Sequence, residues 1–166
     1  TTLFRSYINN FVAYGSIKSA IGDLAIDLSF IPDKGKGISF NGNVNATNLD
    51  VGKLAQTEVL GKTTFQAKVK GTSDEKANIN AFTDATIKSL IANQYNYSGI
   101  EISGNLSNKT YVGSIHLNDP NCKLNFLGKV DFSNSIPVFD FSAFVPKIDL
   151  VKLNLNTTDS VSQASF

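Results

Sequence analysis

The sequence predicts an all-β fold, an antiparallel meander in which each strand has one apolar and one polar face. Three observations lead to this class: apolar and polar residues alternate with a period of two, short turn clusters separate the alternating runs, and small polar residues replace charge. The 166 residues include 18 Asn, 17 Ser and 12 Thr, and only 17% are charged. Most of these small polar residues disfavour helix interiors, because their side chains hydrogen-bond to the nearby backbone.

In the N-terminal half, alternation predicts half-buried strands. Residues 4–14 allow two interpretations, a short helix with one apolar stripe or a strand that continues to Ile17, and residues 53–58 fit a short helical turn. Turn clusters at 33–35 and 71–74 separate the runs. The alternating runs of this half lie at 24–30, 38–46, 65–69 and 79–87.

The C-terminal half continues the same pattern as far as Val145. Residues 89–96 again allow a helix or a strand, and turn clusters lie at 107–109 and 118–121. No linker interrupts the chain, so we expect one β-rich segment over 1–155, followed by a polar, frayed tail over 156–166. The alternating runs of this half lie at 100–102, 111–117, 124–132 and 139–145.

Composition argues against several classes of function. The formal net charge is +1, whereas nucleic-acid-binding proteins usually carry a clustered basic face, so we expect no nucleic-acid partner. One cysteine and one histidine cannot form a disulfide framework or a multi-histidine metal site, so we expect no metal and no cofactor. No apolar run reaches the length of a membrane-spanning helix.

The residues that could do chemistry are scattered. His116 lies between two apolar residues and so faces the polar side of its strand, while Cys122 follows a turn on the opposite parity. Asp131, Asp140 and Asp149 recur at a spacing of nine, but the first two alternate with apolar neighbours as solvated strand residues do. We therefore expect no catalytic residues and no enzymatic activity.

What remains is the long apolar face itself. Gly42, Gly113 and Gly128 interrupt it, and glycines inside strands often mark bends that let a sheet curl. One interpretation is the sealed core of a closed β-sandwich, acting as a structural or adhesion module of the cell envelope. The other is a curled sheet whose apolar side stays open to lipid chains. A transmembrane barrel is less consistent, because residues 159–165 do not alternate.

Three consecutive segments resemble the TamB family of translocation and assembly module proteins, within the AsmA-like superfamily. These segments are YNYSGIEISGNL at 95–106, YVGSIHLNDPN at 111–121 and LNFLGKVDF at 124–132. Shorter segments at 21–24, 51–54, 60–63 and 69–71 are also similar to the family, so the resemblance covers roughly 15–155. The long versions from Bacteroidota are the most similar.

The resemblance implies a non-catalytic internal segment of a longer, envelope-spanning protein. Family members are anchored at the inner membrane and extend through the periplasm of Gram-negative bacteria, and their body is a taco-like groove or half-barrel with an apolar interior. They are linked to phospholipid transport between the two membranes and to outer-membrane protein assembly. The implied partners are phospholipid acyl chains and, through parts of the parent chain outside this segment, an outer-membrane assembly protein.

Alternation and resemblance together give a set of candidate groove-lining residues in the last third of the chain. An exposed sheet edge would in addition favour self-association through strand pairing. The lining candidates are Ile100, Ile102, Leu106, Ile115, Leu117, Leu124, Phe126, Val130, Phe132, Phe139 and Phe141.

Overall fold

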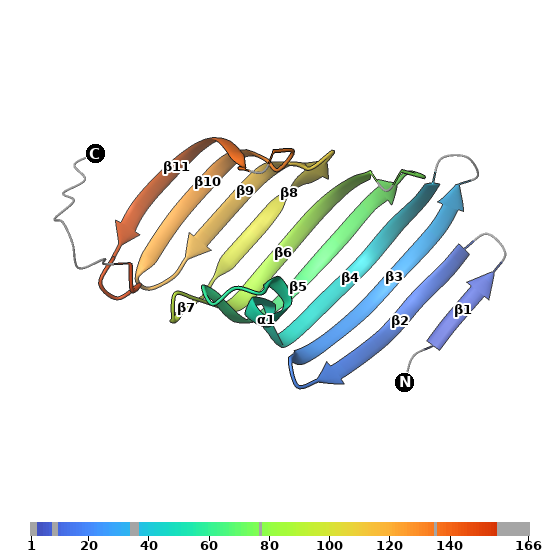
Figure 1. Cartoon of the computed structure of the whole chain (residues 1–166), viewed down its shortest axis with the longest axis horizontal. Coiled ribbons are helices and arrows are strands. Elements are labelled where there is room, and N and C mark those ends of the chain that lie inside the picture. The colour runs from blue at the N-terminus through green and yellow to red at the C-terminus, as the bar shows by residue number, and fades with distance from the viewer. Residues whose placement is uncertain (1–2, 8–9, 34–36, 77, 135, 156–166) are drawn as a thin grey trace.

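The computed structural model describes residues 3–7, 10–33, 37–76, 78–134 and 136–155, which form one antiparallel sheet (Figure 1). The strands follow one another in chain order, and only β7 lies off this path, beside β6. The elements are β1 (Leu3–Tyr7), β2 (Asn10–Ser19), β3 (Gly22–Asp33), β4 (Gly37–Asp50), α1 (Val51–Ala55), β5 (Leu60–Ser73), β6 (Ile79–Ala92), β7 (Tyr95–Tyr97), β8 (Ile100–Ser107), β9 (Thr110–Asn118), β10 (Cys122–Asp131) and β11 (Val138–Ile148).

The predicted all-β meander is confirmed, and the sheet stays open instead of closing into a barrel. A closed sandwich would need two sheets packed face to face, whereas the described strands form a single sheet. The predicted tail at 156–166 lies outside the described residues.

Both ambiguous segments are strands. The helix considered for 4–14 is wrong, because its described residues, 4–7 and 10–14, belong to β1 and β2. The ring of Phe11 stacks on that of Phe30 in β3, with 4.8 Å between centroids. The helix considered for 89–96 is also wrong, because β6 continues to Ala92 and turns into β7. In both segments, pairing with neighbouring strands favours the strand over the helix. The sequence of one segment does not reveal which strands will pair with it.

The predicted helical turn is confirmed as α1, two residues earlier than expected. The Asp50 carboxylate caps it by accepting a hydrogen bond from the Lys53 N–H at 3.0 Å. The turn ends at Gln56, whose φ of 53° is left-handed. In Figure 1, α1 lies over the ends of β5 and β6.

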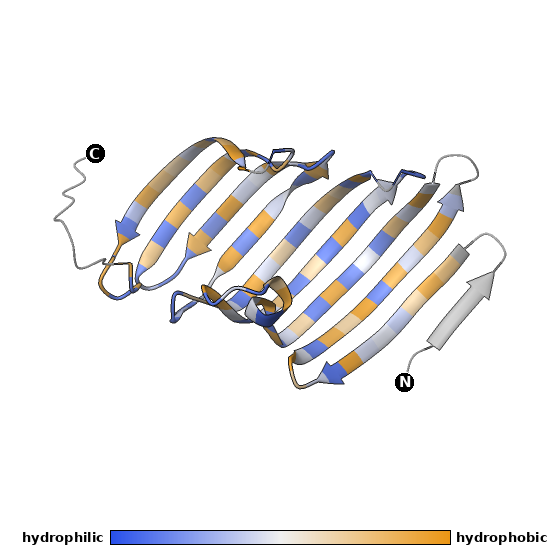
Figure 2. Ribbon diagram, viewed as in Figure 1, coloured by the Kyte–Doolittle hydropathy of each residue, from blue (hydrophilic) through white to orange (hydrophobic). Residues whose placement is uncertain are grey.

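The pairing register gives the sheet one apolar and one polar face, as the alternating colours along each strand in Figure 2 show. Side chains of directly paired residues point to the same face, so the apolar face contains four rows that begin in β2. Three of these rows reach β11 and the fourth ends in β10. The first row is Phe11, Phe30, Phe40, Gly71, Ala81, Leu106, Tyr111, Val130 and Phe139. The second is Ala13, Leu28, Gly42, Val69, Thr83, Gly104, Gly113, Gly128 and Phe141; the third is Gly15, Ile26, Val44, Ala67, Ala85, Ile102, Ile115, Phe126 and Ala143; the fourth is Ile17, Leu24, Ala46, Phe65, Ile87, Ile100, Leu117 and Leu124.

Glycines in these rows let aromatic rings lie flat on the sheet. Gly104 and Gly113 are paired, and the Tyr111 ring covers both; a Cβ built on Gly104 would lie only 2.5 Å from Tyr111 Cζ. The hydroxyl of Tyr111 is buried there without a hydrogen-bond partner. On neighbouring strands, the Phe40 ring covers Gly71 in a similar way, because a Cβ built on Gly71 would lie 2.8 Å from Phe40 Cζ. The rings therefore supply part of the cover that a second layer gives in a sandwich.

We expect Gly104→Ala to lower the free energy of unfolding by about 1–3 kcal/mol, because the added methyl group must displace the Tyr111 ring. Urea denaturation measures this change. In a Tyr111→Ala background the ring is absent, so the same substitution should have little effect. An equal loss of stability in both backgrounds would contradict packing of Tyr111 over Gly104.

Candidate functional site

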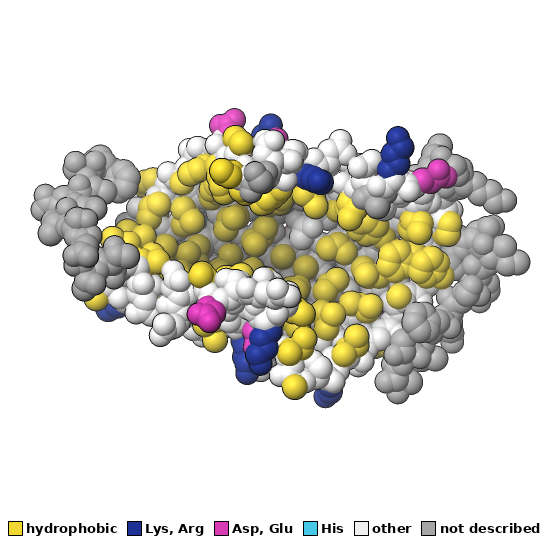
Figure 3. All heavy atoms as spheres, in the orientation of Figure 1, with side chains coloured by type: hydrophobic (Ala, Val, Ile, Leu, Met, Phe, Trp, Pro, Cys, Tyr) yellow, Lys and Arg dark blue, Asp and Glu magenta, His cyan; other side chains and the backbone are white. Residues whose placement is uncertain are grey.

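The apolar face is the candidate site, because it is large, continuous and hollowed. Figure 3 shows hydrophobic side chains filling the hollow, with charged side chains on its rim. The four rows, all within the described residues, contain no Asp, Glu, Lys or Arg, and their only hydrophilic members are Thr83 and the hydroxyl of Tyr111. A monomer rarely leaves so large an apolar surface without a partner or ligand.

The structure places all but one of the predicted lining residues on this face. The exception is Phe132, which lies one residue beyond the end of β10, where its N–H donates to the Lys109 carbonyl. The others occupy the four rows: Leu106, Val130 and Phe139 in the first, Phe141 in the second, Ile102, Ile115 and Phe126 in the third, and Ile100, Leu117 and Leu124 in the fourth.

Ile100 and Leu117 require a correction, because they are buried in a local core and do not line open space. They form a cluster with Cys122 and Leu153, the last only 1% exposed, and Tyr95 and Tyr97 pack against it. Leu153 reaches the cluster from a turn after β11, where the Asp149 carboxylate accepts a hydrogen bond from the Lys152 N–H at 3.1 Å. The apolar hollow therefore has a closed end at the fourth row beneath β7 and this turn.

Sequence reasoning missed the N-terminal half of the site. Phe30, Phe40, Val44 and Val69 lie in the same rows as the predicted residues, although the candidates came only from the last third of the chain. The signal was present in the alternation of 24–30, 38–46 and 65–69, but a sequence does not show that these strands share one sheet with the others.

A buried carboxylate holds the closed end together. Asp119, in the turn between β9 and β10, is 1% exposed and accepts four hydrogen bonds. Its donors are the Tyr95 hydroxyl at 2.5 Å, the N–H and hydroxyl of Ser98, both at 2.9 Å, and the Asn121 N–H at 2.9 Å. Asn121 also donates to the Tyr95 hydroxyl at 3.0 Å. This network ties β7 and the following link to the β9–β10 turn.

The same network shifts two pKa values. Burial raises the pKa of Asp119, but the hydrogen bonds from Tyr95, Asn121 and Ser98 outweigh it, and the net pKa lies below the ordinary value. The pKa of Tyr95 is raised, first because its hydroxyl donates to Asp119 and then because of burial. Asp119 is therefore ionised at neutral pH and accepts hydrogen bonds as a carboxylate.

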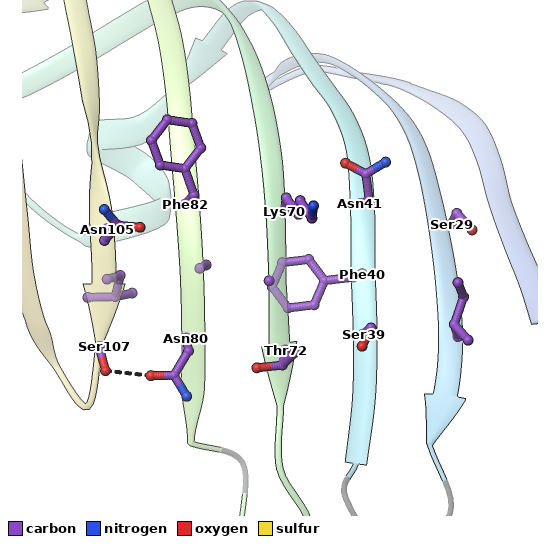
Figure 4. A pocket seen from close by; sticks show the side chains of 14 residues that line it. Ser29, Ser39, Phe40, Asn41, Lys70, Thr72, Asn80, Phe82, Asn105 and Ser107 are labelled. Carbon is purple, nitrogen blue, oxygen red and sulfur yellow. Dashed lines mark hydrogen bonds between the residues drawn. The ribbon is translucent and has the colours of Figure 1, made fainter.

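A further hollow of about 540 Å³ lies along the first row (Figure 4), lined by Phe40, Gly71, Ala81 and Leu106 of that row and by neighbours whose side chains belong to the polar face. Two cross-strand rows border it, and the hydroxyl of Ser107 donates to the side chain of Asn80 within one of them. Amides, hydroxyls and a lysine contribute to this lining beside Ile31 and Phe82, but most of its accessible surface is apolar. The bordering rows are Asn41, Lys70, Phe82 and Asn105, and Ser39, Thr72, Asn80 and Ser107.

His116 and Cys122, two residues considered for catalysis, lie on opposite faces of the sheet. His116 is exposed on the polar face, beside Asn125, whereas Cys122 is buried in the closed-end cluster, where burial raises the pKa of its thiol. Across the described ranges, no group of His, Cys, Asp and Glu is arranged to hold a metal ion. No helix in the described part of the chain is long and apolar enough to cross a membrane.

Comparisons with protein-family models, with curated proteins and with solved structures give no match to this chain. The geometry of the apolar face and the sequence resemblance therefore carry the functional interpretation.

We expect Asp119→Asn to lower the free energy of unfolding at pH 7 by about 1–3 kcal/mol, because an amide cannot accept all four hydrogen bonds and leaves buried donors unpaired. Because the folded pKa is depressed, the stabilisation by the carboxylate is present above the unfolded value of about 4 and is lost as the pH falls through the folded pKa. Urea denaturation between pH 7 and pH 2 should show the two proteins converging in acid.

Asp84→Asn is the matched control, because this carboxylate is exposed on the polar face. Its stability should stay close to that of the unmodified protein. A constant difference between Asp119→Asn and the unmodified protein over the whole pH range would contradict the role given to the carboxylate.

Proposed function

We propose that this chain is a non-catalytic lipid-carrying segment, whose apolar hollow shelters the acyl chains of phospholipids. The observation that carries the proposal is the set of four continuous rows without a single charged residue, of which the described residues cover only part of the fourth row. The resemblance to the TamB family points to the same function. The polar opposite face supports it too, because that side of the sheet can remain in water.

The driving force is transfer of acyl chains out of water. Each buried CH₂ contributes about 0.8 kcal/mol, so full burial of a 16-carbon chain contributes roughly 12 kcal/mol before the loss of freedom on binding is subtracted. The headgroup remains at the open rim, where charged side chains lie in Figure 3. Binding then depends on apolar area and needs no specific polar contact.

Movement along such a surface requires sites of similar energy. A fixed charge within the rows would hold a headgroup at one place or repel an acyl chain, and the rows contain none. The hollow runs across the strands from β2 to β11, so neighbouring strands offer similar apolar positions about 4.8 Å apart. Lipid could pass from one strand to the next with small changes in free energy.

The resemblance extends the proposal to a cellular setting. In that setting the chain is a periplasmic segment of an inner-membrane-anchored protein in the cell envelope of a Gram-negative bacterium. It passes phospholipids between the inner and outer membranes, or assists outer-membrane protein assembly through an assembly protein that binds other parts of the parent chain.

Thr83→Asp tests the acyl-chain site with a small change in volume. Thr83 lies in the second row near the middle of the hollow, so a carboxylate there should repel acyl chains. We expect protein purified without detergent to carry phospholipid, and the substitution to reduce the lipid-to-protein ratio at least several-fold. Native mass spectrometry and organic extraction measure that ratio.

Thr86→Asp is the control, because Thr86 lies on the same strand and faces the polar side. It should keep the bound lipid, and circular dichroism should show both variants folded. Two results would overturn the proposal: unmodified protein that neither contains phospholipid nor takes it up from phosphatidylethanolamine and phosphatidylglycerol vesicles, or equal lipid content in the two variants.

A further inference from the structure

The last described strand, β11, forms one edge of the described sheet and is exposed along its whole length. It carries apolar side chains on both faces, as β9 and β10 also do at Val112 and Leu127. Phe139 and Phe141 lie on the apolar face, but Val138 and Phe144 place apolar side chains on the polar face as well, and Phe144 is 66% exposed. Long apolar edge strands are where sheets pair with other chains, and proteins usually protect them with charges or bulges.

No strand of the described residues pairs with the outer side of β11, and the backbone groups on that side can be assigned from the hydrogen-bond alternation of antiparallel strands. The Phe132 N–H donates to the Lys109 carbonyl, so even-numbered residues of β10 face β9 and odd-numbered residues face β11. Lys129, an odd-numbered residue, pairs with Asp140, so the even-numbered residues of β11 use their backbone groups on β10. The odd-numbered residues Phe139, Phe141 and Ala143 therefore direct theirs outward, away from the sheet.

One antiparallel register makes this edge complementary to itself. With Phe141 opposite Phe141 of a second copy, Phe139 meets Ala143, and Val138 meets Phe144. Asp140 then meets Ser142, whereas shifting the register by one step places Asp140 opposite Asp140, which is unfavourable. This pairing spans Val138–Phe144 and stops before the bulge and Pro146, where a regular ladder ends.

We propose that β11 pairs with β11 of a second copy of this chain in that register, giving a symmetric dimer. The match is apolar against apolar on both faces and leaves no like charges opposite each other. Directly paired residues share a face, so the apolar hollows of the two copies lie on the same side and join across the dimer interface. The proposal does not depend on lipid binding, because it uses the edge of the sheet and not its face.

Opposed charges at one cross-strand pair test the register. In Val138→Lys/Phe144→Lys, each lysine faces a lysine of the other copy, and the dimer should dissociate into monomers. In Val138→Lys/Phe144→Asp, the same positions carry opposite charges, and the dimer should return. Sedimentation velocity and light scattering over a range of concentrations measure the mass, and circular dichroism checks folding.

Disulfide trapping tests the same register without weakening the interface. Asp140 and Ser142 face each other across the proposed interface as a non-hydrogen-bonded pair, with Cα atoms about 4.5 Å apart, which suits a disulfide. Asp140→Cys/Ser142→Cys should form a covalent dimer on mild oxidation, and each single variant should form far less. Cys122 is present and buried in all of them, so it does not account for a difference.

Four results would overturn the proposal. These are unmodified protein that stays monomeric at all attainable concentrations, open-ended oligomers in place of dimers, a lysine–lysine variant that remains dimeric, or cross-linking as efficient in the single cysteine variants as in the double one. Open-ended oligomers would indicate that β11 pairs with a different edge.

Discussion

The structure depends on one constraint: the pairing register must keep the apolar residues of ten consecutive strands on the same face of the sheet. A shift of one residue anywhere would turn every apolar side chain beyond that point to the polar face. The irregularities that do occur, at Ala46/Leu49, at Leu60/Thr63 and Thr64/Phe65, and at Lys123/Asn125, lie near the closed end of the hollow. The first three rows therefore cross from β2 to β10 without a break, and the ends of the strands absorb the bends.

Without a second layer, the sheet covers its apolar face with its own parts. At one end, Leu153, Tyr95 and Tyr97 pack over the fourth row, and the Asp119 carboxylate fixes the segments that carry them. In the middle, aromatic rings lie on paired glycines, as Tyr111 does on Gly104. These two devices stabilise the sheet while leaving most of the apolar face uncovered, which is what a surface for acyl chains requires.

Alternation predicted the strands and the face of nearly every candidate residue, because side-chain direction in a strand is local and has a period of two. It could not predict that Ile100 and Leu117 are buried, since the residue that covers them, Leu153, is distant in sequence and belongs to an irregular turn. The β6–β7 hairpin was ambiguous for a related reason. Its turn residues Asn93 and Gln94 both adopt positive φ, 48° and 62°, and only asparagine signals that conformation in a sequence.

The apolar face of the sheet and the outer edge of β11 require different partners. An apolar face can be covered by lipid, because acyl chains offer area and require no hydrogen bonds. The edge of β11 cannot be satisfied by lipid, because its outward N–H and C=O groups need water or another strand. Its apolar side chains on both faces make water a poor partner for the strand as a whole. Pairing at this edge would stabilise the protein in two ways. The outward backbone groups would form hydrogen bonds, and the side chains of Phe139 and Phe141 would be partly buried. The rest of the apolar hollow would stay open.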